Sequence, residues 1–110
     1  VTGVQTCALP IWKLLSHTAR HYVTVTDGEA AQAMRILGNP LDGDTPITAG
    51  ESGAAGVAAL LAGVCVDALR KQLNLTSEAR VLCINTEGDT DQINYRRVVW
   101  NGIPTSDLNF

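Results

Sequence analysis

The stretch from Ala54 to Val66 contains thirteen consecutive apolar residues, and it limits the possible folds more than any other part of the chain. It is too short to span a bilayer, for which a helix needs about 20 residues. We expect a buried helix that starts after the turn Gly50 to Ser52 and continues to about Asn74. Because this helix gains a polar face only after Asp67, other layers of structure must cover it.

Three further helices are expected. Trp12 to Ala19 is typical of the end of a helix, and Gln92 to Trp100 predicts a short last one. Between them, Thr26 and Glu29 have the spacing of a capping box, in which each side chain satisfies a free backbone amide. Gly38-Asn39-Pro40 ends the helix that starts there. One face of that helix repeats apolar residues at helical spacing: Ala30, Ala33, Met34 and Leu37.

Three segments rich in β-branched or other apolar residues alternate with these helices and predict strands: His21 to Val25, Ile47 to Ala49 and Arg80 to Asn85. Strands that alternate with helices through short connections form right-handed crossovers and a parallel sheet. The expected fold class is therefore α/β, with helices flanking a parallel sheet.

Charge and cysteine content narrow the class of protein. The net charge of −3 argues against nucleic acid or an anionic membrane surface as a partner, because proteins that bind either one usually carry a basic surface patch. The three cysteines lack paired spacing, so we expect reduced thiols and a cytoplasmic location.

The three expected strands end in similar polar sequences: VTVTD, TAGES and INTEGD. In open parallel sheets, ligands bind beyond the carboxyl ends of the strands, so these ends predict one wall of a cleft. The alternative is that the polar residues are helix caps. We favour a cap for Thr26 and Asp27. Glu51-Ser52 and Asn85 to Asp89 carry more polar groups than a cap needs, which favours a site.

The sequence GESGAAG, at the start of the apolar helix, leaves the first helical turn almost without side chains. Another group or a cofactor can therefore approach the backbone of Gly53 to Gly56 closely. A helix N-terminus attracts anions, but Glu51 already places a negative charge there. We expect a carboxylate that orients an amine or a water molecule rather than a phosphate site.

Other reactive residue types give weaker candidates. Nothing in the sequence near His17 or His21 would pair with them, so surface or packing roles are favoured. Cys65 and Cys83 are interpreted as buried small apolar residues. The Asp42 to Asp44 loop lacks the spacing of a calcium-binding loop, and no metal site is predicted.

The first eleven residues, VTGVQTCALPI, show neither strand alternation, nor a helical period, nor the layout of a signal peptide. Translated back into codons, they resemble a common sequencing-library adapter. We therefore expect residues 1–11 to be foreign, residues 12–102 to belong to the protein proper, and residues 103–110 to form a polar tail.

Three stretches together resemble the C-terminal part of the diaminopropionate ammonia-lyase family: TVTDGEAAQAMRILGNP, ITAGESGAAGVAAL and VLCINTEGDTDQINYRRVVWNG. This family belongs to the fold type II enzymes that use pyridoxal 5'-phosphate (PLP). The first stretch is general to the fold type, whereas GESGA and NTEGDTD together are specific to the lyase.

The resemblance also implies site residues. It places Asn85 or Thr86 beside the pyridine nitrogen of PLP, as a neutral partner that leaves this nitrogen largely unprotonated. A serine is the more familiar residue at the position of Asn85. Glu51 and Ser52 match a pair near the cofactor ring, and Glu87 with Gly88 completes the wall. Asp89 is either part of this wall or an ion-pair partner.

The activity that the resemblance implies is elimination of ammonia from 2,3-diaminopropionate to give pyruvate and a second ammonia, in a cytoplasmic homodimer. The Schiff-base lysine and the phosphate-binding loop of the family are expected upstream of this chain. Its only lysines are Lys13, at a helix end, and Lys71, on a polar helix face, and both are expected to be solvated. We therefore expect no catalytic residue within the chain and no activity of the chain alone. The alternatives are part of a serine or threonine dehydratase, or a non-catalytic α/β binding module.

Overall fold

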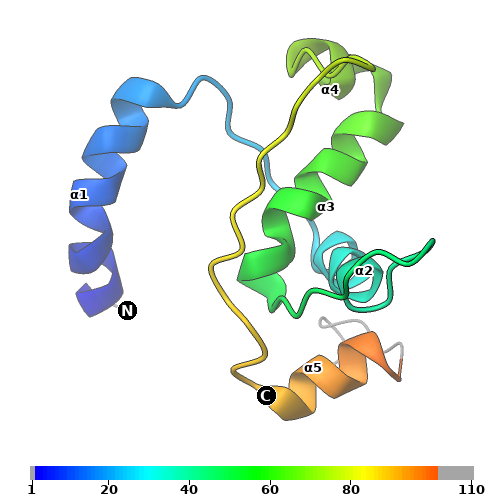
Figure 1. Cartoon of the computed structure of the whole chain (residues 1–110). Helices are drawn as coiled ribbons and strands as arrows, with labels where there is room; N and C mark the ends of the chain where they lie inside the picture. The colour runs from blue at the N-terminus through cyan, green and yellow to red at the C-terminus, as the bar shows by residue number, and fades with distance from the viewer. Residues whose placement is uncertain (1, 102–110) are drawn as a thin grey trace.

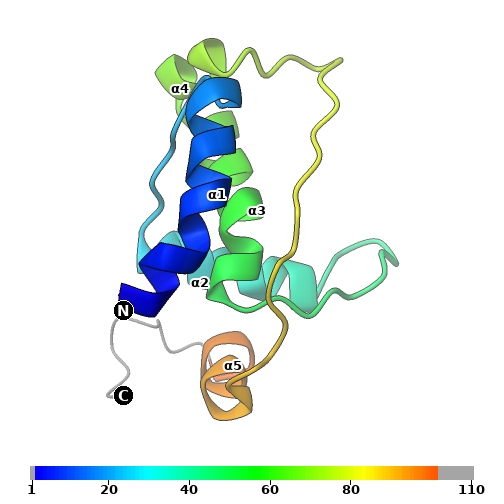
Figure 2. The ribbon, with the colours of Figure 1, turned by 90° about the vertical axis from the view of Figure 1, so that its left-hand side faces the viewer.

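The computed structural model describes residues 2–101, with side-chain detail from Pro10 onward. It contains the helices α1 (Thr2–Thr18), α2 (Asp27–Gly38), α3 (Glu51–Cys65), α4 (Asp67–Gln72) and α5 (Gln92–Val99). Extended segments join them. Figures 1 and 2 show α3 in the middle, with α2 crossing near its start, α4 at its far end and α5 below α2.

Helix α1 covers most of the segment expected to be foreign, and it contains Pro10. The helix therefore includes residues 2–11, although their sequence shows no helical period. The expected polar tail, residues 103–110, lies outside the described residues.

Helix α2 begins as predicted, at a capping box. The Glu29 backbone N–H donates to Thr26 Oγ1 at 3.2 Å, and the Thr26 N–H donates to the Glu29 carboxylate at 2.8 Å. The helix ends at Gly38, and Met34 is 1% exposed in the core. Local sequence signals thus fix both ends of α2.

The apolar helix is shorter than predicted, because it ends at Cys65 rather than near Asn74. Val66 has an extended backbone, and it both terminates α3 and precedes α4. Its N–H donates to the Ala62 carbonyl at 3.0 Å, and its carbonyl accepts from the Arg70 N–H at 2.9 Å. The two helices therefore form a continuous path with a bend at a β-branched residue.

The predicted strands His21–Val25, Ile47–Ala49 and Arg80–Asn85 do not form within residues 2–101, so the parallel sheet is not observed there. The physical reason is that a strand requires a neighbouring strand for its backbone hydrogen bonds. Arg80–Asn85 instead runs as an extended chain beside α3 (Figure 1), and its apolar side chains are open to solvent: Leu82 is 86% and Ile84 71% exposed.

The core is small and lies where α2, α3 and α5 meet. Its buried residues are Ala31, Ala33, Met34, Ala49, Ala54, Ala58, Val98 and Val99. Of the later turns of α3, only the end is uncovered, since Gly63 is buried but Val64 is 54% exposed. Cys65 is also exposed, which contradicts its predicted burial, and Cys83 is only partly buried. Within the described residues, no helix is long and apolar enough to span a membrane.

Candidate functional site

Two of the predicted polar ends meet at the start of α3. The N–H of Gly50 donates to the carbonyl oxygen of Glu87 at 2.8 Å. Nearby, the Asn85 side-chain amide donates to the Thr48 carbonyl at 3.1 Å and accepts from the Glu87 N–H at 3.3 Å. The TAGES and INTEGD segments, two of the three predicted polar ends, are therefore joined by direct hydrogen bonds; no residue of VTVTD is among the described residues that line the pocket beside this junction.

The two glycines of GESG make this junction possible. A Cβ atom on Gly53 would collide with Asn85 Oδ1 and with the Glu87 carbonyl oxygen. A Cβ on Gly50 would collide with the Glu87 carboxylate and would lie 2.6 Å from the Gly88 carbonyl oxygen. The close approach predicted from the bare first turn is thus made by the polypeptide segment Asn85–Gly88.

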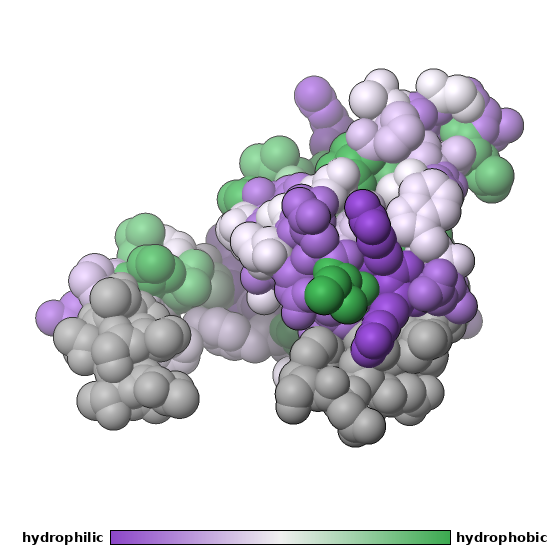
Figure 3. All heavy atoms as spheres, turned by 90° about the horizontal axis from the view of Figure 1, so that it is seen from below, coloured by the Kyte–Doolittle hydropathy of each residue, from purple (hydrophilic) through white to green (hydrophobic). Residues whose placement is uncertain are grey.

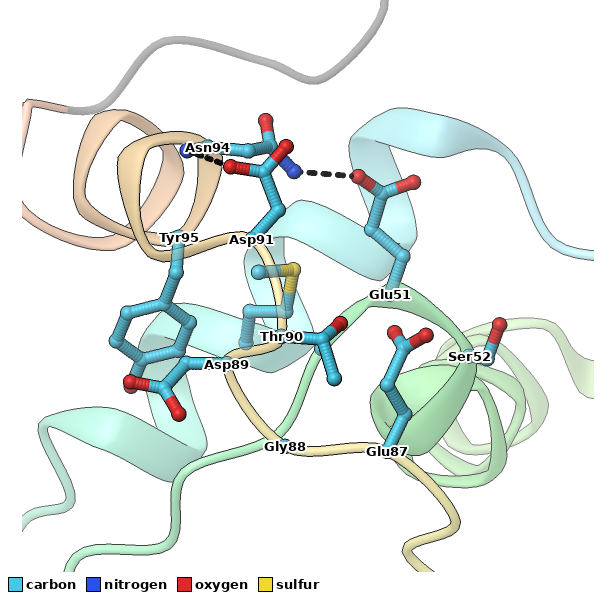
Figure 4. Close-up of a pocket in the computed structure, with 11 residues that line it drawn as sticks. Glu51, Ser52, Glu87, Gly88, Asp89, Thr90, Asp91, Asn94 and Tyr95 are labelled. Atoms are coloured by element: carbon cyan, nitrogen blue, oxygen red, sulfur yellow. Dashed lines mark hydrogen bonds between the residues drawn. The ribbon is translucent and has the colours of Figure 1, made fainter.

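Helix α5 closes another side of the site. Asp91 caps it by accepting a hydrogen bond from the Asn94 N–H at 3.0 Å. The Asn94 side-chain amide donates to the Glu51 carboxylate at 2.9 Å, so it links α5 to the first residue of α3 (Figure 4). The cap residue of α5 is therefore Asp91, whereas α3 is preceded by Gly50 and has no side-chain cap.

These segments enclose an open pocket of about 310 Å³. Its lining comes from α2, the start of α3, the 87–91 segment and α5: Met34, Gly50, Glu51, Ser52, Glu87, Gly88, Asp89, Thr90, Asp91, Asn94 and Tyr95. Figure 3 views the molecule from below, where α5 lies, and this part of the surface is mostly hydrophilic.

Four carboxylates line the pocket: Glu51, Glu87, Asp89 and Asp91. No lysine, arginine or histidine is among the described lining residues. Such a wall attracts ammonium groups and hydrogen-bond donors, and it repels phosphate. Among the described residues, no group of three or more His, Cys, Asp or Glu side chains is arranged to hold a metal ion.

Of the predicted site residues, Glu51, Ser52, Glu87 and Gly88 line this pocket, whereas Asn85 and Thr86 lie next to it but not in its lining. Sequence reasoning did not find Asn94 as a pocket residue. Its three-residue spacing from Asp91 is that of a helix cap and its partner, a signal that indicates a helix start and not a site.

Comparison with known proteins identifies a class of enzyme. The chain is homologous to a PLP-dependent ammonia-lyase. Over 95 residues it is 44% identical to diaminopropionate ammonia-lyase of Escherichia coli K12 and 39% identical to that of Salmonella typhimurium LT2. These alignments include 83% of the chain and 24% of each enzyme, so the chain spans about a quarter of their length. No protein-family model matches the chain.

Solved structures give the same result. The E. coli lyase in complex with D-serine matches 83% of the chain with a TM-score of 0.76 and 44% identity, over 24% of its own chain. Its complex with an aminoacrylate–PLP azomethine reaction intermediate matches 69% with a TM-score of 0.64 and 48% identity, over 21%. The backbone path described above is thus similar to that of the matched part of this lyase.

Proposed function

We propose that the chain forms part of a PLP-dependent lyase that converts 2,3-diaminopropionate and water into pyruvate and two molecules of ammonia. The observation that carries this proposal is the hydrogen-bonded junction of GESG with Glu87, which builds an acidic pocket wall in a chain homologous to that lyase. The activity, substrate and homodimeric, cytoplasmic state of the whole enzyme are part of the proposal.

The pocket fits one part of PLP and not another. Carboxylate and hydroxyl groups suit the ring edge and the amino groups of a diamino acid. The dianionic phosphate does not suit this wall, since no cationic side chain is among its described lining residues. Glu51, Ser52, Glu87 and Gly88 would therefore face the ring and the substrate. When bound, PLP supplies the electron sink for loss of the α-proton and of the β-amino group.

The two candidates for the ring nitrogen differ in what they already bind. The Asn85 amide is engaged with the backbone of Thr48 and Glu87. Thr86 follows it directly and is exposed. This favours the Thr86 hydroxyl as the neutral partner of the nitrogen, with Asn85 holding the segment in place.

The extended segments fit a sheet that is completed elsewhere in the enzyme. Arg80–Asn85 exposes large β-favouring side chains, including Leu82 and Ile84. Neighbouring apolar side chains of this size are rarely exposed on the surface of a complete protein. Because the chain spans about a quarter of the related lyases, we propose that other parts of the enzyme pair with this segment in a parallel sheet.

The test is an exchange enzyme: the E. coli diaminopropionate ammonia-lyase in which the homologous segment is replaced by residues 12–101. We expect it to bind PLP and to release pyruvate from 2,3-diaminopropionate, with the unaltered E. coli enzyme as the control. Faster turnover of serine or threonine would instead support a dehydratase. A folded, PLP-loaded exchange enzyme without any of these activities would contradict the proposal.

A further inference from the structure

Among the described residues, a single side chain donates a hydrogen bond to the carboxylate of Glu51. Asn94 Nδ2 donates to Glu51 Oε1 at 2.9 Å, and both residues are partly buried. No arginine or lysine lines the pocket among its described residues, so no cation there competes for this carboxylate. The direction of the Glu51 carboxylate therefore depends on Asn94.

Asn94 is itself fixed in place. Its backbone N–H is bound by the Asp91 carboxylate at the start of α5, and its neighbour Tyr95 packs against the core. Figure 4 shows the Asn94 amide between Asp91 and Glu51, reaching across from α5 to α3. The amide nitrogen must face Glu51, because the opposite orientation would place two oxygens in contact.

The other end of the amide is not satisfied within the described structure. Asn94 Oδ1 is buried and has no hydrogen-bond partner. A buried unpaired acceptor is unfavourable for folding. The bond to Glu51 is therefore the interaction through which this side chain contributes to the site.

We infer that Asn94 is a positioning residue, which holds the Glu51 carboxylate toward the pocket so that it binds an amino group of the substrate. This inference rests on the proposed function. It assigns to α5 a role in selecting a diamino acid over an amino acid whose β-substituent is uncharged.

The test uses the exchange enzyme and its variants N94A, E51Q and N94A/E51Q, with Q92A as the control, because Gln92 is an exposed α5 residue outside the pocket lining. We expect N94A to lower kcat/KM for 2,3-diaminopropionate about tenfold, mainly through KM, because a hydrogen bond to a charged group is lost. In the E51Q background, N94A should have almost no further effect. N94Q, which retains the amide, should recover part of the activity.

Two controls separate the possible failures. PLP absorbance and melting temperature should be the same for N94A and Q92A, which excludes a purely structural effect. Equal kcat/KM values for N94A and the unmodified exchange enzyme, or additive effects of N94A and E51Q, would overturn the inference while leaving the proposed function intact. If N94A does not fold, N94Q takes its place. The kcat/KM values of N94Q and of the double variant E51Q/N94Q are then compared by the same criteria. An inactive exchange enzyme would overturn both.

Discussion

The N–H of Gly50 donates a 2.8 Å hydrogen bond to the carbonyl oxygen of Glu87, across a separation of 37 residues between Gly50 and Glu87 along the chain. This bond joins the start of the apolar helix to the polar segment that follows Arg80–Asn85. The pocket wall exists because these two backbones are in direct contact.

Gly53→Ala should disrupt this contact. The added methyl group would overlap Asn85 Oδ1 and the Glu87 carbonyl, so we expect a loss of about 1–3 kcal/mol of stability in the exchange enzyme. Gly56→Ala is the matched control on the same helix, because its nearest neighbour, Cys83 Cβ, would lie at 3.5 Å. Differential scanning fluorimetry should show a lower melting temperature for G53A only, and equal values would disprove the close approach.

Glu51→Gln should impair the reaction more than the fold. The neutral amide cannot attract the ammonium group of the substrate, so we expect kcat/KM for 2,3-diaminopropionate to fall at least about tenfold in the exchange enzyme. Glu78→Gln removes an exposed carboxylate outside the pocket lining and serves as the control. A coupled pyruvate assay measures both, and identical losses would argue against a specific role for Glu51.

Thr26→Ala should weaken the start of α2. It removes the oxygen that accepts the Glu29 N–H, and the typical cost of losing such a cap is about 1 kcal/mol. Thr24→Ala, at an exposed position in the preceding extended segment, should have little effect. Hydrogen exchange of the first α2 amides reports the difference, and unchanged protection in T26A would mean that the capping box is not formed.

The 110-residue chain alone should show no lyase activity with added PLP and 2,3-diaminopropionate, because neither of its two lysines, Lys13 and Lys71, lines the described pocket. Measurable pyruvate release by the purified chain would contradict this expectation.

The same chain should bind a hydrophobic dye and associate, since Leu82, Ile84 and Val64 are exposed. Leu82→Glu should reduce both effects, whereas Thr86→Glu, at an exposed polar position, should not. Cooperative thermal unfolding of a monomer that binds no dye would instead support an independent binding module.

The helices were predictable where a local interaction defines them. Thr26 with Glu29 starts α2 and Gly38-Asn39-Pro40 ends it, and both signals lie within a few residues of the structure they determine. The bend at Val66 was missed because no glycine or proline stands next to it, and the helix-favouring residues Ala68 and Leu69 follow.

The predicted strands did not form within the described residues, and the reason differs from the one that applies to the bend at Val66. Sequence indicates that Arg80–Asn85 favours an extended conformation, and it is extended, but a ladder depends on a neighbouring strand that no local signal provides. The rule that polar strand ends converge still predicted that Glu51 and the Glu87–Gly88 segment line one pocket. Asn94 was missed because its bond to Glu51 joins residues 43 positions apart.

The most direct measurement is a crystal structure of the exchange enzyme with PLP bound. We predict that Glu51 lies within about 4–5 Å of the cofactor ring and that the Thr86 hydroxyl is within hydrogen-bonding distance, about 3 Å, of the pyridine nitrogen. A ring bound elsewhere, with Glu51 and residues 85–88 in contact with neither cofactor nor substrate, would contradict the account.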